Sequence, residues 1–221
     1  MPGNIFLIGI TAVSTRAYLF DFDGTLIDSM GGFANIAGET IHRFHPEMSF
    51  ETARARYLET SGVPFFQQLE IIFPGDPKNK EIAAIFEETK INGFFSERFH
   101  DDVVYTISTL RERGHIVGVC SNNFQHLIDK FVEREGLVFD IVLGFREGFE
   151  KGKDHFQHVM KTFSLSNEEL TFVGDSLKDA EKAMTNNLRF VGICGTFQEK
   201  DFHSISPDLL TIHNIKELLE L

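Results

Sequence analysis

The sequence predicts an α/β protein in which a parallel sheet carries helices on both faces and an α-helical segment is inserted after the first strand. Three observations support this fold class. Beyond residue 101, short apolar runs alternate with stretches that have the periodicity of amphipathic helices. These runs are apolar throughout, as expected of strands buried on both faces of a sheet. Between residues 28 and 100 the pattern is helical and contains no strand-like run.

The first expected strand covers Ala17–Phe20, because this apolar run ends at acidic residues and Gly24, which favour a turn. Residues 4–13 are apolar but follow no Lys or Arg, so we expect an extra strand or a loosely held leader there rather than a signal peptide. Ser49 and Pro77 are residue types that commonly begin helices. Four helices are expected in the inserted segment, over residues 32–44, 50–60, 65–73 and 77–94.

From residue 101 onward, helices and strands alternate. The expected strands cover residues 116–120, 139–143, 170–173 and 189–193, and the expected helices cover 102–113, 124–135, 154–163, 177–185 and 215–221. Parallel neighbours need crossover connections, so this alternation predicts a Rossmann-like sheet. We therefore expect an α/β core domain of residues 1–27 and 101–221 and a helical domain of residues 28–100.

Composition excludes several classes of protein. The chain has 221 residues and a formal net charge of −12, which argues against binding to nucleic acid or to anionic membranes, since both require a basic surface. No run reaches the roughly 20 apolar residues that span a bilayer. Cys120 and Cys194 lie in apolar runs of the kind that form buried strands. Two unpaired structural thiols predict a reducing, cytoplasmic environment.

Polar residues follow four of the expected strands. They are Asp21 and Asp23 after the first, Ser121, Asn122 and Asn123 after the second, Lys151 and Lys153 after the third, and Asp175, Ser176 and Asp179 after the fourth. Ligands of open parallel sheets bind at the carboxyl ends of the strands. These side chains are therefore expected to converge on one site.

The charges of these residues indicate the kind of ligand. Asp21, Asp23 and Asp175 would repel one another if they were brought close together without compensation. A hard divalent cation removes this conflict, and Mg²⁺ prefers a few carboxylates together with water and substrate oxygens. A lysine and the Ser121 hydroxyl would then face an anion. This combination is typical of a phosphate site.

A family resemblance agrees with this interpretation. Asp21-Phe22-Asp23-Gly24-Thr25-Leu26 resembles the first motif of the haloacid dehalogenase superfamily, Ser121 the second, Lys151 or Lys153 the third, and Gly174-Asp175-Ser176-Leu177-Lys178-Asp179 the fourth. The resemblance extends over residues 17–193 in the family's order. The helical insertion resembles the cap of the phosphoglycolate phosphatase-like subgroup. Gly152 stands where proline often follows the third-motif lysine, which favours Lys151 but leaves Lys153 open.

The resemblance implies a Mg²⁺-dependent phosphatase that hydrolyses small phosphorylated metabolites. Asp21 would be the nucleophile and would form an aspartyl-phosphate. Asp23 would protonate the leaving oxygen and then deprotonate the hydrolytic water. The Asp21 and Asp175 carboxylates and the Asp23 backbone carbonyl would hold Mg²⁺, with Asp179 in the outer shell. The phosphate oxygens would be bound by Ser121, the Asn122 backbone and either Lys151 or Lys153.

Simpler interpretations of single residues remain. Asp21 and Asp23 could form a turn, Ser121 and Asn122 could cap a helix, Asp179 could be a solvated helix acid, and Asp28 could cap the first inserted helix.

Other functions also remain: a haloacid dehalogenase, a phosphomutase, or a catalytically silent binding protein. A dehalogenase needs no leaving-group acid or metal, so Asp23 and Asp175 argue against it. The sequence predicts neither the substrate nor the oligomeric state. In the inserted segment, Arg54, Arg56 and residues 62–66 are candidate substrate contacts, and hinges are expected near residues 27–30 and 99–102.

Overall fold

The computed structural model describes residues 14–221, so the strand or leader expected at residues 4–13 lies outside the described part of the chain. Its core is a six-stranded parallel sheet with the order β3-β2-β1-β4-β5-β6. The strands are β1 (Ala17–Phe20), β2 (Ile116–Phe124), β3 (Ile141–Phe145), β4 (Leu170–Gly174), β5 (Arg189–Ile193) and β6 (Leu210–Ile212). The predicted α/β fold class with a parallel sheet is confirmed.

Helices cover both faces of the sheet because alternate strand residues point to opposite sides. The helices of the core are α5 (Asp101–Glu112), α6 (Gln125–Glu135), α7 (Lys153–Phe163), α8 (Leu177–Thr185) and α9 (Glu199–Ile205), with short 3₁₀ helices η1 (Asn167–Glu169) and η2 (Ile215–Glu220). Tyr18 and Phe20 of β1 belong to the apolar cluster that includes α5, α6 and η2. Ala17 and Leu19 belong to the cluster on the other face, with α7, α8 and α9.

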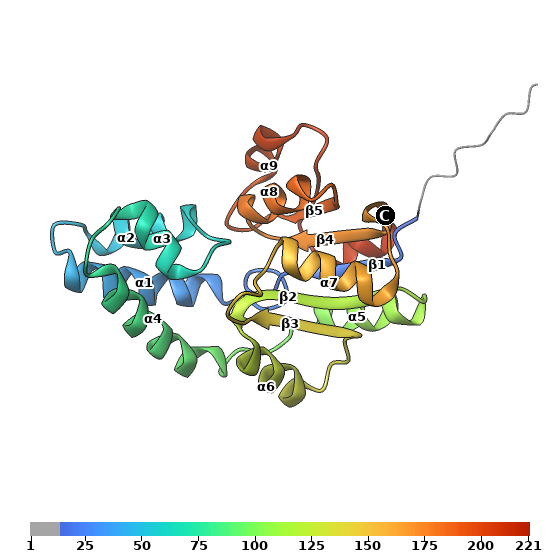
Figure 1. Ribbon diagram of the computed structural model, residues 1–221, viewed down its shortest axis with the longest axis horizontal. Helices are drawn as coiled ribbons and strands as arrows, with labels where there is room; N and C mark the ends of the chain where they lie inside the picture. The colour runs from blue at the N-terminus through green and yellow to red at the C-terminus, as the bar shows by residue number, and fades with distance from the viewer. Residues whose placement is uncertain (1–13) are drawn as a thin grey trace, which may run out of the picture.

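The inserted segment is helical, as expected. It consists of α1 (Met30–Phe44), α2 (Phe50–Glu59), α3 (Phe65–Ile72) and α4 (Asn79–Phe94). These helices lie together beyond the carboxyl ends of the strands (Figure 1). Their interior is aromatic, with the rings of Phe65 and Phe86 only 4.0 Å apart between centroids. Phe94 connects this interior to the core, since its ring lies 5.6 Å from that of Phe22, which follows β1.

Several expected boundaries were wrong. β2 continues past Cys120 to Phe124, because the polar residues after Cys120 stay extended and Phe124 still pairs with Phe145 after an irregularity in the register. β3 begins at Ile141 rather than at residue 139. The residue before it, Asp140, accepts a hydrogen bond from the Val117 N–H through its side-chain carboxylate at 2.8 Å.

Two elements of the C-terminal region were not predicted. α9 and the three-residue strand β6 lie in a polar stretch with little apolar periodicity, and the final helix is a 3₁₀ helix. Asp28 does not cap α1, whose N-cap residue is Ser29. Ser49 does cap α2, because its Oγ accepts a hydrogen bond from the Thr52 N–H. Within residues 14–221, no helix has the length and apolar character needed to cross a bilayer.

Candidate active site

The first acidic residue of the site follows β1 directly. The Asp21 N–H donates to the Val173 carbonyl of β4 at 2.8 Å, which continues the sheet pairing by one residue. The chain then turns at Gly24, which has φ +76°. A Cβ atom on Gly24 would lie 2.2 Å from Asp175 Oδ2, so glycine is required for the β4 carboxylate to approach this turn.

Three buried carboxylates converge behind this turn. One oxygen from each of Asp21, Asp175 and Asp179 lies within 4.8 Å of the others, and the three residues are at most 5% exposed. Asp179 is therefore not a solvated helix acid. Its Oδ2 accepts a hydrogen bond from Ser176 Oγ at 2.6 Å, and Ser176 Oγ in turn accepts from the Asp179 N–H and caps α8.

Of the two candidate lysines, Lys151 enters the acidic cluster. Its Nζ lies 3.0 Å from Asp21 Oδ1 and 2.8 Å from Asp179 Oδ1, and its side chain is 3% exposed. Lys153 is the first residue of α7 and is exposed to solvent. Burial would lower the pKa of Lys151, but the neighbouring Asp179 and Asp21 carboxylates outweigh this and raise it. Lys151 is thus a fixed positive charge.

One lysine does not balance three carboxylates. Burial raises the pKa of Asp21 from 3.8 to about 7, with further contributions from Asp179 and Asp23, while Lys151 opposes the shift. Burial, and then the charges of Asp21 and Asp179, also raise the pKa of Asp175 well above its ordinary value. Lys151 and Lys182 outweigh burial at Asp179 and lower its pKa.

The residues of this cluster fit a divalent cation. Asp175 Oδ2 is buried and has no hydrogen-bond partner among the described residues. It belongs to the same group of close carboxylates as Asp21. A cation would supply the partner that Asp175 lacks and would stabilise both carboxylates in their ionised form. Asp179 Oδ1 also has no hydrogen-bond partner among the described residues, but it is ion-paired with Lys151 Nζ at 2.8 Å, and Oδ2 accepts from Ser176, which suits a position outside the innermost ligands.

Asp23 stands apart from this cluster and is held by neutral donors. Its Oδ1 accepts a hydrogen bond from Ser29 Oγ at 2.7 Å, and its Oδ2 accepts one from Asn123 Nδ2 at 2.6 Å. The sequence placed Asn123 at a strand end but gave it no role. Asn123 directly follows Ser121 and Asn122 at the end of the second strand, and this position could have indicated a role in the site.

Ser121 and Asn122 do not cap a helix, because α6 begins at Gln125 and Phe124 occupies its N-cap position. Ser121 is 1% exposed and its Oγ accepts a hydrogen bond from the Asn123 N–H at 3.0 Å. Asn122 lines the pocket described next, and its Oδ1 is buried without a partner among residues 14–221.

A pocket of about 80 Å³ lies between the acidic cluster and the helical insertion. The core contributes Asp21, Asp23, Asn122, Lys151 and Asp175, and the insertion contributes Met30, Tyr57, Ser61, Gly62, Val63, Pro64, Phe65, Gln68, Phe86, Glu87 and Lys90. The expected contact segment 62–66 therefore reaches the pocket through residues 62–65. Arg54 and Arg56 were wrong as candidates, because they bond to Asn35 and Glu59 on the exposed surface of the insertion.

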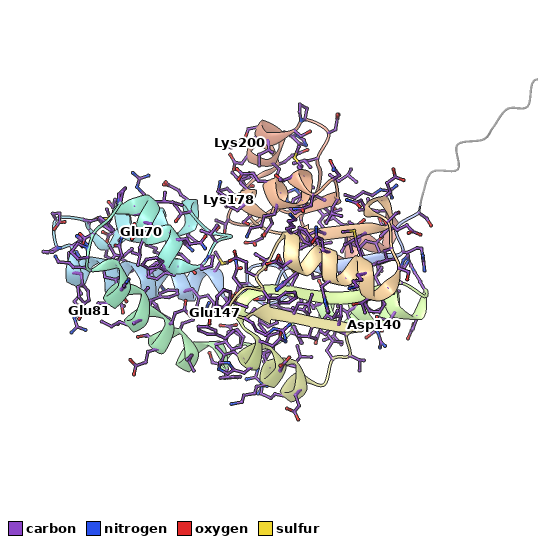
Figure 2. All side chains as sticks on the ribbon, viewed as in Figure 1. Glu70, Glu81, Asp140, Glu147, Lys178 and Lys200 are labelled. Carbon is purple, nitrogen blue, oxygen red and sulfur yellow. The ribbon has the colours of Figure 1, made fainter. Side chains whose placement is uncertain are left out.

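The loop between α2 and α3 holds the insertion against the core. The Gly62 carbonyl accepts hydrogen bonds from Lys182 Nζ at 2.6 Å and from Asn122 Nδ2 at 3.3 Å. Gly62 has φ +92°, and a Cβ atom there would lie 2.4 Å from Ser176 Oγ and 2.7 Å from Lys178 Cβ. Figure 2 shows Lys178 on the side of α8 that faces the insertion. The contact is thus close enough to exclude any side chain at residue 62.

Comparisons with known proteins agree with this geometry. A family model described as haloacid dehalogenase-like hydrolase matches residues 18–193. A phosphoglycolate phosphatase of Photorhabdus laumondii is 26% identical, with 92% of this chain and 91% of that protein covered. The pyrophosphatase PpaX of Oceanobacillus iheyensis is 23% identical, with coverage of 95% and 97%.

The solved structures show the same fold. A haloacid dehalogenase-like hydrolase from Streptococcus pneumoniae superposes with a TM-score of 0.77 at 18% identity, over 93% of this chain and 97% of that one. The family match spans the strand ends that carry Asp21, Ser121, Lys151 and Asp175. On this evidence, the chain belongs to the haloacid dehalogenase-like hydrolase family, as the four motifs of its sequence predicted.

Proposed function

We propose that the protein is a Mg²⁺-dependent phosphatase that hydrolyses small phosphomonoesters through an aspartyl-phosphate. The observation that carries this proposal is the placement of Asp21, which opens on the pocket while its Oδ1 is ion-paired to the buried Lys151. A carboxylate that is fixed in direction and faces a small cavity is suited to nucleophilic attack. Relatives named as phosphoglycolate phosphatase and pyrophosphatase support the reaction class.

Each step uses residues of this chain. The Asp21 carboxylate attacks phosphorus, and the bond from phosphorus to the leaving oxygen breaks. Asp23, in its protonated form, transfers its proton to that oxygen. Asp23 then takes a proton from the water that attacks the aspartyl-phosphate, which releases inorganic phosphate and restores Asp21. Lys151, Ser121 and the Asn122 backbone bind the phosphate oxygens through these steps.

We propose that Mg²⁺ is held by the Asp21 and Asp175 carboxylates and the Asp23 backbone carbonyl, with Asp179 outside them. When bound, the cation supplies positive charge next to the transferred phosphoryl group. The close, buried carboxylates and the unpartnered Asp175 Oδ2 support this assignment. The unpaired cysteines Cys120 and Cys194 support the expected cytoplasmic location.

The proposed function is tested by a screen of phosphorylated metabolites, with inorganic phosphate as the readout. The screen should include phosphoglycolate and inorganic diphosphate, which represent the reactions in the relatives' names. We expect hydrolysis of at least one phosphomonoester with Mg²⁺ and none in EDTA. A dependence on added sugar bisphosphate would instead indicate a phosphomutase. Release of halide from a haloacid in EDTA would indicate a dehalogenase.

Mg²⁺ should stabilise the fold, and more so at pH 8 than at pH 5.5. A carboxyl group whose folded pKa is raised favours the folded state at low pH, and this advantage is lost as the pH rises through the folded pKa, which is about 7 for Asp21. Protons therefore compete with the cation at pH 5.5 and not at pH 8. At a saturating concentration we expect the thermal midpoint to rise by about 5 °C or more at pH 8.

The matched control for the metal is Asp175→Asn, which keeps the shape of the side chain and removes its charge. This variant should lose most of the Mg²⁺-dependent rise. An equal rise at the two pH values, or an unchanged rise in the variant, would show that the cation binds elsewhere.

We further propose that residues 28–100 form a cap domain that opens to admit substrate and closes through the Gly62 contact. Gly62→Ala should raise KM by about tenfold, because the new Cβ would contact Ser176 and Lys178 and push the loop away from the core. Gly75→Ala is the matched control, since Gly75 also has a positive φ (+70°) but has no neighbouring atom within 4 Å of an added Cβ. Equal KM values for the two variants would contradict closure through Gly62.

A further inference from the structure

A chain of hydrogen bonds connects Asp23 to the helical insertion through Asn123 and Lys90. Asn123 Nδ2 donates to Asp23 Oδ2 at 2.6 Å, and Asn123 Oδ1 accepts from Lys90 Nζ. Asp23 and Asn123 belong to the core, whereas Lys90 lies on α4 of the insertion. The chain therefore crosses the boundary between the two parts of the molecule at the pocket.

Lys90 is well placed to control the orientation of the Asn123 amide. A lysine can only donate hydrogen bonds, and Asp23 Oδ2 accepts one from Asn123, so one orientation of the amide satisfies both neighbours. Without Lys90, the amide can rotate and accept the proton of a protonated Asp23 through Oδ1, which the hydrogen bond from Lys90 Nζ otherwise prevents. Asn123 is 4% exposed, so solvent has little access to replace the missing donor.

The Lys90 ammonium is itself fixed by the aromatic interior of the insertion. It lies 4.6 Å from the centroid of the Phe33 ring and 5.8 Å from that of Phe86. Contacts of a cation with ring faces at these distances are attractive. Lys90 therefore moves with the insertion, and its contact with Asn123 exists only while α4 lies against the carboxyl end of β2.

We propose that Asn123 is a positioning residue for Asp23, and that Lys90 holds Asn123 in the required orientation only when the insertion is closed over the sheet. This inference rests on the proposed function, in which Asp23 protonates the leaving oxygen. Closure then aligns the proton donor at the same time as it encloses the substrate. An open insertion removes the Lys90 contact and leaves Asp23 without a correctly oriented amide.

Two substrates that differ only in their need for a proton donor test this role. Phenyl phosphate and 4-nitrophenyl phosphate have nearly the same shape, but the nitrophenolate ion leaves readily without protonation. The parameter kcat/KM reports steps up to departure of the leaving group, so the later hydrolysis of the aspartyl-phosphate does not affect it. In Asn123→Ala we expect the ratio of kcat/KM for 4-nitrophenyl phosphate to that for phenyl phosphate to rise about tenfold.

An isosteric variant separates positioning from packing. Asn123→Leu keeps about the size of the side chain but removes both the donor to Asp23 and the acceptor of the Lys90 hydrogen bond. We expect it to raise the same ratio at least as much as Asn123→Ala. If Asn123 only fills space, the isosteric variant should keep the wild-type ratio. Thermal unfolding of both variants identifies any that fail to fold. A substitution of Lys90, which lies outside the sheet, provides a second test.

Lys90→Met retains the stem over Phe33 and removes the donor. It should raise the ratio of kcat/KM values about fivefold or more, and the double variant with Asn123→Ala should be no worse than Asn123→Ala alone, since both act on one group. Lys80→Met is the matched control, because Lys80 is an exposed residue of the same helix. It should leave the ratio unchanged.

The outcomes separate this inference from the proposed function. The proposed function fails if the wild-type protein releases no phosphate from either substrate in Mg²⁺. It also fails if the Asp21→Asn variant retains activity. If the wild type is active but the Asn123 and Lys90 variants lower kcat/KM equally for both substrates, only the positioning role is overturned. Additive effects in the double variant would show that Lys90 contacts the substrate directly and does not act through Asn123.

Discussion

Asp21→Asn is expected to leave the fold intact and to lower turnover by about 10⁴-fold or more. A neutral amide oxygen does not attack phosphorus, and loss of a nucleophile is among the largest effects of single substitutions in enzymes. The variant keeps the shape of the side chain, and its amide oxygen can still accept from Lys151. It also removes a carboxyl group whose pKa is raised by burial, and Asp179 still pairs with Lys151 at 2.8 Å, so the folded state is not expected to lose stability.

The measurement combines phosphate release with chemical trapping. Acid quenching of the wild-type protein during turnover should retain labelled phosphate on Asp21, and the variant should retain none. Asp208→Asn is the control, because Asp208 is exposed in a turn before β6 and far along the chain from the site. Residual activity within tenfold of wild type, or label on another residue, would remove Asp21 from the role of nucleophile.

Much of the site could be predicted because the topology of the sheet brings its residues together. In a parallel sheet, residues that directly follow the strands must meet at one edge, whatever their distance in sequence. Asp21 and Asp175 follow adjacent strands β1 and β4 and lie within one cluster of carboxylates. The apolar runs that predicted these strands are strong signals, since each strand is buried on both faces.

The insertion could be predicted to be helical, but its contribution to the pocket could not. Which helical residue faces the site depends on how four helices pack together, and periodicity marks only the buried side of each. Arg54 and Arg56 were chosen for their charge, yet they bond to Asn35 and Glu59 outside the pocket, whereas Tyr57 of the same helix lines the pocket. Nothing in the sequence near Lys90 indicated a role for it, because its partner Asn123 is 33 residues away in the chain and belongs to the sheet.

The C-terminal part of the sheet was missed for a different reason. β6 is an edge strand of three residues, and one of them, Leu210, is 55% exposed. Such a strand is determined by pairing with β5 rather than by its own composition. The same dependence on tertiary contacts applies to the end of β2, where Phe124 pairs with Phe145 of β3 beyond the polar residues.

Lys151→Met should lower turnover by about 10²-fold or more, whereas Lys153→Met should change it by less than about threefold. The Lys151 ammonium lies within 3.0 Å of both Asp21 and Asp179, so its removal takes away a fixed charge beside the nucleophile and the phosphate. Lys153 is exposed at the start of α7 and has no such position. Substitutions at surface residues of this kind rarely have large effects.

Loss of Lys151 should also destabilise the protein, which must be separated from its effect on catalysis. Removing one partner of a buried ion pair leaves charge uncompensated and costs on the order of 3–5 kcal/mol. Thermal unfolding in Mg²⁺ should therefore show a lower midpoint for Lys151→Met than for Lys153→Met, and kcat should be compared well below both midpoints. Equal losses of kcat in the two variants, or a greater loss in Lys153→Met, would contradict the assignment, because the exposed lysine would then have to reach the phosphate in the closed enzyme.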